Sequence, residues 1–220
     1  MSFSKTFNRF LAIVFLSAFA YLPLTGYFDA RRAESEIDIR SLQQKLAHLE
    51  AGNAKIKNKM IKKAKIATIL EKFKTRLGYE PEKIAELLME QSERYSLDPL
   101  LIIALIKTES DFRRKAVSKK GAVGLMQVRP FVAIALAKET RVVYKNSKNL
   151  KDGALNIKLG THYFAKLRKR FGSLELALVA YNRGPSRLRR QIGAGKTIRS
   201  AYANKVLRHY DRFSSDFSAL

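Results

Sequence analysis

Residues 100–130, LLIIALIKTESDFRRKAVSKKGAVGLMQVRP, decide the fold. The stretch opens with an apolar run of helical character that ends at a carboxylate, Glu109. A basic turn with Ser118 follows, and a second apolar run at 124–128 is stopped by Pro130. Burial at the end of an apolar helix disfavours the charged form of a glutamate. We therefore expect a raised pKa for Glu109, as a general acid working near neutral pH needs.

The composition is strongly basic. The 220 residues include 43 Lys and Arg against 19 Asp and Glu, for a formal net charge of +24. Such a surface favours polyanionic partners, namely nucleic acid, an anionic membrane or an anionic cell-wall polymer. The chain has no cysteine, which excludes disulfides, thiolate metal sites and a cysteine nucleophile. Its 3 histidines lie far apart in the sequence, so we predict no metal site and no cofactor.

The N-terminal segment, residues 1–28, is predicted to be a signal-anchor or a signal peptide. Lys5 and Arg9 precede the stretch 10–28, which contains no charged residue. About 20 apolar residues span a bilayer. A small-residue cleavage site is present at 18–20, but the apolar run continues beyond it, which favours the uncleaved anchor. The leading cations would stay cytoplasmic. We expect an inner-membrane protein with its body in the periplasm, or an exported protein, and no nucleic-acid partner.

Residues 29–79 are predicted to form a basic helical stalk. Four apolar residues follow a heptad spacing of 3, 4 and 3, which is typical of a weak coiled coil and allows self-association: Ile39, Leu42, Leu46 and Leu49. The segment 55–65 is rich in lysine. It is either a solvated helix face or a patch that binds anionic lipid or cell-wall polymer.

Residues 80–220 are predicted to form the globular part, with a mainly α fold. Asp98 and Pro99 form a helix cap, and the helix after them ends at Glu109. The only alternating pattern that suggests a strand is 141–144. Further helices are expected at 131–139, 150–171, 174–181 and 198–213.

The surroundings of Glu109 in the sequence favour chemistry with a single carboxylate. A glycosidase usually needs two, but Asp111 would point to another side of the helix, and Asp152 and Glu175 are distant in sequence. One carboxylate suffices if an N-acetyl sugar supplies its own acetamido oxygen as nucleophile. Glu109 would protonate the leaving oxygen and then act as a base. Side chains suited to orienting the sugars are Ser118, Gln127, Tyr181 and Asn182.

Five motifs in this order resemble the catalytic domain of the soluble-type (SLT) lytic transglycosylases, the family related to goose-type lysozyme. The resemblance covers about residues 85–213. The motifs are Glu109-Ser110, then Ser118 with Gly121-Ala122, Gly124-Leu125-Met126-Gln127, the Asn156–Tyr163 helix and Ala180-Tyr181-Asn182-Arg183-Gly184. The closing segment Thr197–Tyr202 resembles the family's last helix, whose Tyr faces the cleft.

The resemblance implies a lysozyme-like fold that cleaves the β-1,4 bond between N-acetylmuramic acid and N-acetylglucosamine in peptidoglycan. It also implies a 1,6-anhydro product, with Glu109 as acid and then base. Five residues would bind the substrate: Ser118, Gln127, Tyr181, Asn182 and Tyr202. Arg129 and Arg183 depart from the commoner family pattern, which puts the preference of individual sugar subsites in doubt.

Two other functions stay open from the sequence. A hydrolytic, lysozyme-type muramidase on the same fold would release reducing ends in place of anhydro ends. A cationic scaffold that binds the cell wall without catalysis would explain the charge, although the intact Glu109 speaks against it. On spacing alone, Glu109 could also be a helix-end carboxylate paired with Lys107 or Arg113.

Overall fold

The protein is described from a computed structural model. It describes the backbone of residues 3–220 and the side chains of residues 26, 27, 29, 31, 32, 34–36 and 38–220. The chain divides into two compact units, residues 1–58 and 59–220. Within the described residues, no helix is long and apolar enough to cross a membrane. The predicted anchor, residues 1–28, lies almost entirely outside the described side chains, so it stays a prediction.

A single long helix, α1 (Phe3–Glu71), runs through the first unit and ends in the second. Its predicted heptad residues are exposed: the exposed fraction is 53% for Ile39, 61% for Leu42, 57% for Leu46 and 63% for Leu49. No element of the first unit covers this apolar seam, within the part that the structure describes.

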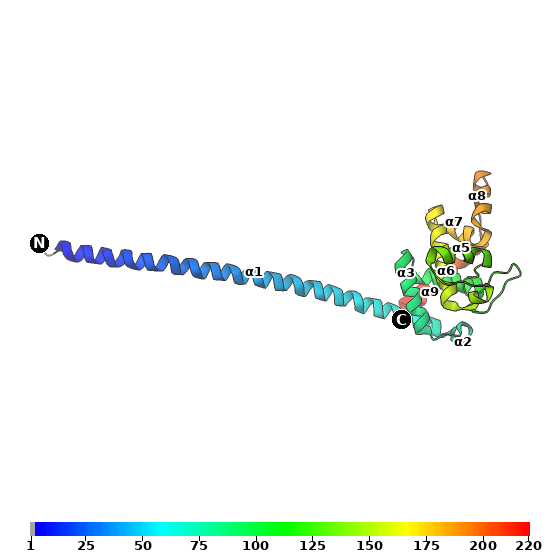
Figure 1. The fold of residues 1–220 in the computed structure, drawn as a ribbon, viewed down its shortest axis with the longest axis horizontal. Coiled ribbons are helices and arrows are strands. Elements are labelled where there is room, and N and C mark those ends of the chain that lie inside the picture. The colour runs from blue at the N-terminus through cyan, green and yellow to red at the C-terminus, as the bar shows by residue number, and fades with distance from the viewer. Residues whose placement is uncertain (1–2) are drawn as a thin grey trace. The chain divides into compact units, whose positions relative to one another are not determined.

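The second unit is helical (Figure 1). After the end of α1, its elements are α2 (Lys74–Leu77), α3 (Pro81–Tyr95), α4 (Pro99–Ser110), α5 (Pro130–Thr140), the 3₁₀ helix η1 (Ser147–Lys151), α6 (Gly153–Phe171), α7 (Leu174–Arg183), α8 (Pro185–Gly193) and α9 (Ala201–Ala219). The described residues contain no strand beyond isolated bridges of Val123 with Val117 and Val128. The mainly α fold is therefore confirmed.

Helix α4 forms the centre of this unit. Its side chains from Pro99 to Ile106 are buried, which matches the continuous apolar run of the sequence. The helix begins as predicted, because the Asp98 side chain accepts a hydrogen bond from the Leu100 N–H over 2.8 Å and Pro99 takes the first helical position. Helix α9 packs along α4, and α6 contacts α3, α5 and α7. This packing fixes the end of α4, where Glu109 lies.

An aromatic cluster holds the chain just beyond α4. The ring of Phe112, which is fully buried, stacks on Phe73 with centroids 4.0 Å apart. Phe213 from α9 packs edge-on against both rings at 6.4 Å. Phe73 precedes α2 in the segment assigned to the stalk, and the end of α1 also contributes Ile66, Ile69 and Leu70 to the core. The compact unit thus starts at Lys59, earlier than the predicted globular part.

Two local expectations from the sequence were wrong. Residues 141–144 form no strand: Arg141, with φ of 55°, caps α5, and the Val142 N–H bonds back to the Ala137 carbonyl. The β-branched Val142 and Val143 lie in the irregular segment after this cap, and no described residue pairs with them in a strand. Helix α8 was not expected, because it buries only Leu188 and its remaining residues are mostly polar or basic.

Candidate active site

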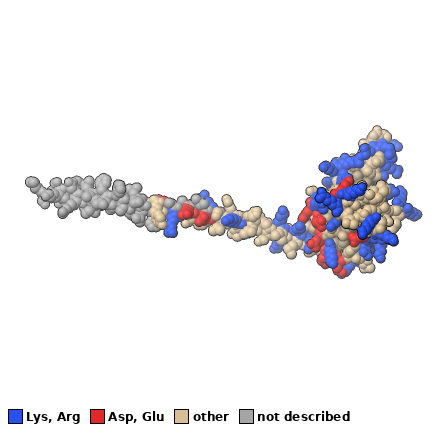
Figure 2. Space-filling view, viewed as in Figure 1, with Lys and Arg blue, Asp and Glu red and all other residues tan. Residues whose placement is uncertain are grey.

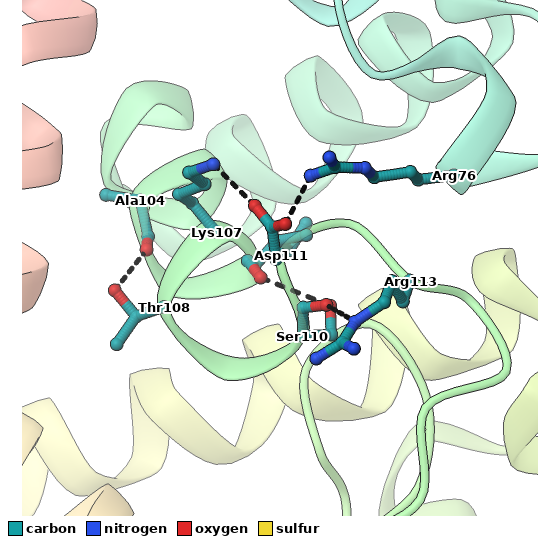
Figure 3. A network of polar contacts seen from close by, with 8 residues as sticks. Arg76, Ala104, Lys107, Thr108, Ser110, Asp111 and Arg113 are labelled. Carbon is teal, nitrogen blue, oxygen red and sulfur yellow. Dashed lines mark hydrogen bonds and ion pairs between the residues drawn. The ribbon is translucent and has the colours of Figure 1, made fainter.

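The carboxylate of Glu109 is placed by the end of α4. Asp111 stops the helix in a left-handed conformation, with φ of 52°. Its own carboxylate forms ion pairs with Lys107 and Arg76 (Figure 3). These cations hold the pKa of Asp111 below its usual range, chiefly through the hydrogen bond from Lys107. Asp111 therefore stops the helix, whereas the prediction from the sequence assumed that the helix continues, and two cations engage its carboxylate.

Ser110 connects the end of α4 to the second apolar run. Its side chain is buried, and its hydroxyl donates a hydrogen bond to the Leu125 carbonyl over 2.8 Å. The Arg113 Nε–H donates to the Ser110 carbonyl over 3.0 Å, as Figure 3 shows. Ser110 thus fixes the geometry at the end of α4.

Glu109 has the perturbed acidity expected of a general acid. It is partly buried, and burial raises the pKa of its carboxyl to about 7. Two contacts act in the opposite direction: the hydroxyl of Tyr202 donates a hydrogen bond to Glu109 Oε1 over 2.5 Å, and the charge of Lys205 favours the carboxylate. Both residues lie on α9. Desolvation outweighs these contacts, so the group is poised between its two protonation states near neutral pH.

Tyr181 lies on the same side of the site. Its hydroxyl donates a hydrogen bond to the Met126 carbonyl over 2.7 Å. Burial raises the pKa of Tyr181 well above its ordinary value, and the charge of Glu109 raises it further, which places the phenol near the carboxylate. The ring of Tyr163 packs against it with centroids 5.5 Å apart. Both phenols therefore stay protonated at neutral pH and can donate hydrogen bonds.

Asn156, a buried amide on α6, holds the run 124–128 in place. Its Oδ1 accepts a hydrogen bond from the Met126 N–H over 2.7 Å, and its Nδ2 donates to the carbonyls of Val123 and Leu150. Gly124 makes room for this amide: a Cβ there would lie 2.2 Å from Asn156 Nδ2. Gly160 makes room for Met126 in the same way: a Cβ on Gly160 would lie 2.6 Å from the Cβ of Met126. The motif at 124–127 and the motif on α6 therefore pack directly against each other.

The side chains of Gln127 and Ser118 form hydrogen bonds with the backbone of the loop between α4 and α5. Gln127 has φ of 50°, and its Nε2 donates to the carbonyls of Gly124 and Ala116, at 2.9 and 3.3 Å. The Ser118 hydroxyl accepts a hydrogen bond from the Ala122 N–H over 3.0 Å. The side chain of Asn182, in contrast, is exposed and forms no hydrogen bond with any described residue. Of the predicted site residues, Tyr202 bonds directly to Glu109, and Tyr181 lies near enough for the charge of Glu109 to raise its pKa.

Other charged groups lie elsewhere. Asp152 accepts a hydrogen bond from the Tyr79 hydroxyl, and Glu175 accepts one from Ser173. Within the described residues, no carboxylate other than Glu109 belongs to its cluster, and no group of His, Asp and Glu side chains could hold a metal ion. The arrangement therefore offers one carboxyl group with two phenols beside it.

Three further contacts were not predicted from the sequence, and only the first involves Glu109. Lys205 acts on Glu109 from the next turn of α9, and only the helical spacing of three from Tyr202 could have indicated it. Arg183 connects the end of α7 to the segment before α9, because it donates to the Arg199 carbonyl over 2.5 Å and to Gln191 over 3.3 Å. Its departure from the family pattern thus has a structural reason. Arg129 stacks on the exposed ring of Phe131, 4.6 Å from its centroid.

Comparison with known protein families shows which family this chain belongs to. The family described as "Transglycosylase SLT domain" matches residues 86–203. The chain belongs to this family. The match includes Glu109 and all five predicted substrate-binding residues, and it covers more than half of the chain.

Several lytic transglycosylases are similar to this SLT-domain protein. Membrane-bound lytic murein transglycosylase E of Buchnera aphidicola subsp. Baizongia pistaciae is 32% identical over 131 residues, which cover 52% of this chain and 59% of that protein. The soluble lytic murein transglycosylase of Escherichia coli K12 is 32% identical over 108 residues, or 47% of this chain and 17% of that protein. The chain thus spans less than two thirds of either relative.

Solved structures agree with the lysozyme-like fold of the SLT family. An inactive variant of the lytic transglycosylase Slt from Pseudomonas aeruginosa superposes with a TM-score of 0.54 at 25% identity, over 61% of this chain and 24% of that chain. The 70-kDa soluble lytic transglycosylase in complex with bulgecin A gives a TM-score of 0.54 at 26% identity, over the same shares of the two chains.

Proposed function

We propose that this protein is a peptidoglycan lytic transglycosylase. It cleaves the β-1,4 bond between N-acetylmuramic acid and N-acetylglucosamine and leaves a 1,6-anhydro-muramic end. The observation that carries this proposal is the isolated, partly buried Glu109, with its pKa raised to about 7 and the Tyr202 hydroxyl on its carboxylate. Membership of the SLT family and the names of the relatives support it.

Glu109 acts twice in the proposed reaction. The protonated carboxyl donates its proton to the glycosidic oxygen, and the bond from that oxygen to the muramoyl C1 breaks. The acetamido oxygen of the same sugar stabilises C1. The carboxylate of Glu109 then takes the proton of the C6 hydroxyl as that oxygen bonds to C1. The acid is regenerated and no water is consumed, so a second carboxylate is not required.

The proposed substrate contacts use hydrogen-bonding capacity that the fold leaves free. Gln127 donates through its Nε2 to two carbonyls, so its Oε1 stays available for an N–H of an acetamido group. The Ser118 hydroxyl accepts from Ala122 and keeps its own proton to donate. Asn182 is exposed with both amide atoms available. Tyr181 and Tyr202 would close the site around Glu109.

The mass of the products tests the reaction. Purified peptidoglycan is digested with the wild type and with Glu109→Gln, and the fragments are analysed by mass spectrometry. Anhydro-muropeptides from the wild type and none from the variant are expected. Reducing ends, which are heavier by one water, would show a hydrolytic muramidase. A wild type that binds sacculi and releases nothing would show a cationic wall-binding scaffold.

We also propose that the protein works in the cell envelope, held to the inner membrane by residues 1–28 with the SLT domain in the periplasm. The apolar N-terminal sequence and the membrane-bound relative support this location. Selective digestion of the periplasmic domain by protease added to spheroplasts would test it. A protected SLT domain would contradict the proposed orientation.

The stalk at residues 29–79 also has a surface suited to self-association. The exposed seam at Leu42, Leu46 and Leu49 has the heptad spacing that a second copy covers in a coiled coil. In a parallel pair, Lys45 would face Glu50 of the second copy at flanking positions, where opposite charges attract. We therefore propose a parallel homodimer of the stalk.

A further inference from the structure

A basic cavity lies beside the segment that follows the end of α4. Its volume is about 500 Å³, and it is lined by the segment 113–117 together with Thr75, Arg76 and Gly78 of the α2 region. Four of these lining residues are cationic: Arg76, Arg113, Arg114 and Lys115. No Asp or Glu is among the described residues that line it, and Asp111 is linked to the lining only through its ion pair with Arg76.

Arg114 is held in position before any ligand binds. Its guanidinium lies over the ring of Tyr79, 5.0 Å from the centroid, and its Nη1 is 3.5 Å from the phenol oxygen. Tyr79 is in turn fixed by hydrogen bonds with Asp152 and with the Gly153 N–H, at 3.0 and 3.1 Å. Gly78 leaves the necessary space, because a Cβ there would lie 3.3 Å from Arg114 Nε. An ordered guanidinium loses little entropy when it binds a carboxylate.

The other cations differ in how far their charge is compensated. Arg76 shares Asp111 with Lys107 (Figure 3), so one carboxylate serves two cations. Arg113 donates its Nε–H to a backbone carbonyl and forms no ion pair with any described residue. Lys115 is exposed and forms neither an ion pair nor a side-chain hydrogen bond within the described chain. The cavity therefore carries a surplus of positive charge that favours an anion.

The position of the lining segment 113–117 in the sequence indicates which anion the cavity binds. The segment 113–117 connects the end of α4, with Glu109, to Ser118, which is a proposed sugar contact. Ala116 and Val117 add an apolar rim, and Val117 is 59% exposed. A ligand that has carboxylates on short aliphatic side chains matches both the charge and this rim.

We infer that this cavity binds the carboxylates of a peptidoglycan peptide stem, and that it thereby favours strands that still carry their stems. This inference rests on the proposed function, since it assigns a second part of the same substrate. Arg114 provides a planar, ordered donor for one carboxylate. Lys115 supplies a charge that no ion pair compensates, and Arg113 adds a third cation to the two that share the single carboxylate of Asp111. The cavity contributes to substrate binding and not to the chemical step at Glu109.

Two substitutions test the inference without altering a contact of Glu109. Lys115→Glu and Thr75→Glu each place a carboxylate in the cavity from an exposed position with no recorded side-chain contact. The control is Lys169→Glu on the last turn of α6, which lowers the net charge as much as Lys115→Glu and lines neither the cavity nor the site. Circular dichroism confirms that each variant is folded.

The kinetic measurement compares two substrates: glycan strands with intact stems, and the same strands after an amidase has removed the stems. On stem-bearing strands, KM should rise about fivefold to tenfold for Lys115→Glu, with kcat unchanged, because a favourable charge contact becomes repulsive. On stem-free strands both cavity variants should match the wild type, and the control should match it on both. An equal change on both substrates, or no change relative to Lys169→Glu, would overturn the inference.

A binding measurement keeps the inference separate from the reaction. Stem peptide released from peptidoglycan by amidase is titrated into the full-length protein by calorimetry, with the wild type and Lys115→Glu. Binding that is lost in the variant supports the inference even if the wild type releases no anhydro product, in which case only the proposed function fails. Absence of peptide binding overturns it. Binding of inorganic phosphate or of vesicles containing phosphatidylglycerol that Lys115→Glu abolishes, without peptide binding, would assign the cavity to phosphate groups instead.

Discussion

The Tyr202 hydroxyl and the Glu109 carboxylate form a 2.5 Å hydrogen bond between residues 93 positions apart in the chain. The bond joins the end of α4 to the first turn of α9. Tyr202 stabilises the ionised form of Glu109, while burial stabilises the protonated form more strongly. This pair therefore sets the pH range in which the protein has both an acid and a base available.

The pH dependence of the reaction should report on Glu109. Because the reaction begins with proton donation by Glu109, kcat/KM should fall as pH rises through about 7. This fall is the alkaline limb of the pH profile. Initial rates of anhydro-product release between pH 5 and 9 measure it. A limb near the ordinary pKa of a glutamate, about 4.3, would contradict a buried acid.

Replacing Tyr202 by Phe should move the same limb to higher pH. The substitution removes the hydrogen bond that lowers the pKa of Glu109, so the carboxyl stays protonated over a wider range. The rate below the limb should fall about tenfold or more, because the carboxylate formed during the reaction loses a charged hydrogen bond. Lys205→Gln is the companion variant: it should shift the limb in the same direction with no loss of a hydrogen bond to Glu109. A limb that moves to lower pH in Tyr202→Phe would exclude the assigned role.

The free energy of unfolding should also depend on pH through the raised pKa of Glu109. The folded-state pKa of Glu109 is raised above its usual value, so its contribution is most favourable at low pH and is lost as pH rises through about 7. Glu109→Gln should therefore be more stable than the wild type at pH 8, by up to about 3 kcal/mol, and the gain should shrink toward pH 5. Thermal unfolding of both proteins at the two pH values provides the comparison. A variant that is less stable than the wild type at pH 8 would argue against a costly buried charge.

Part of this site could be predicted from the sequence because it depends on local rules. The cap at Asp98 and Pro99 determines where α4 begins, and the continuous apolar run buries the helix up to the turn that carries Glu109. The order of the motifs indicated the family, and the family match over residues 86–203 confirmed it.

What the sequence did not provide depends on contacts between distant segments. The bond from Tyr202 to Glu109 and the one from Tyr181 to Met126 follow from how α7 and α9 pack, which no local spacing determines. Helix α8 was missed because it is short and mostly polar or basic: Leu188 and Ile192 have helical spacing, but two apolar residues are a weak signal, and only Leu188 is buried. The strand predicted at 141–144 was wrong because Arg141 is the left-handed cap of α5 and no described segment pairs with the residues after it.

Self-association of the stalk can be measured on the full-length protein in detergent by sedimentation equilibrium. The wild type should dimerise, and Leu46→Lys should weaken the dimer at least about tenfold, because a charge replaces an apolar residue of the seam. Ala47→Lys is the matched control, since it adds the same charge on a neighbouring exposed position outside the heptad seam. A monomeric wild type, or equal effects of the two substitutions, would contradict the proposed dimer.

The two glycines of the loop between α4 and α5 provide a last test of how the site is held. Gly121 and Gly124 both have positive φ, at 74° and 85°, so alanine is strained at either position. They differ in their surroundings: a Cβ on Gly121 meets nothing within 4 Å, whereas one on Gly124 would lie 2.2 Å from Asn156 Nδ2 and 2.3 Å from the Leu150 carbonyl oxygen. Gly121→Ala should therefore cost only the backbone strain, about 1 to 2 kcal/mol.

Gly124→Ala should cost considerably more, because the amide of Asn156 must move and its three hydrogen bonds, two to the loop and one to Leu150 of η1, would be lost or lengthened. Displacement of Met126 would also shift the carbonyl that Tyr181 binds, so activity should fall more than in Gly121→Ala. Urea unfolding and the rate of anhydro-product release, measured on both variants, provide the comparison. Similar losses in the two variants would mean that the strain of the turn, and not the packing around Asn156, determines the geometry of the loop beside Glu109.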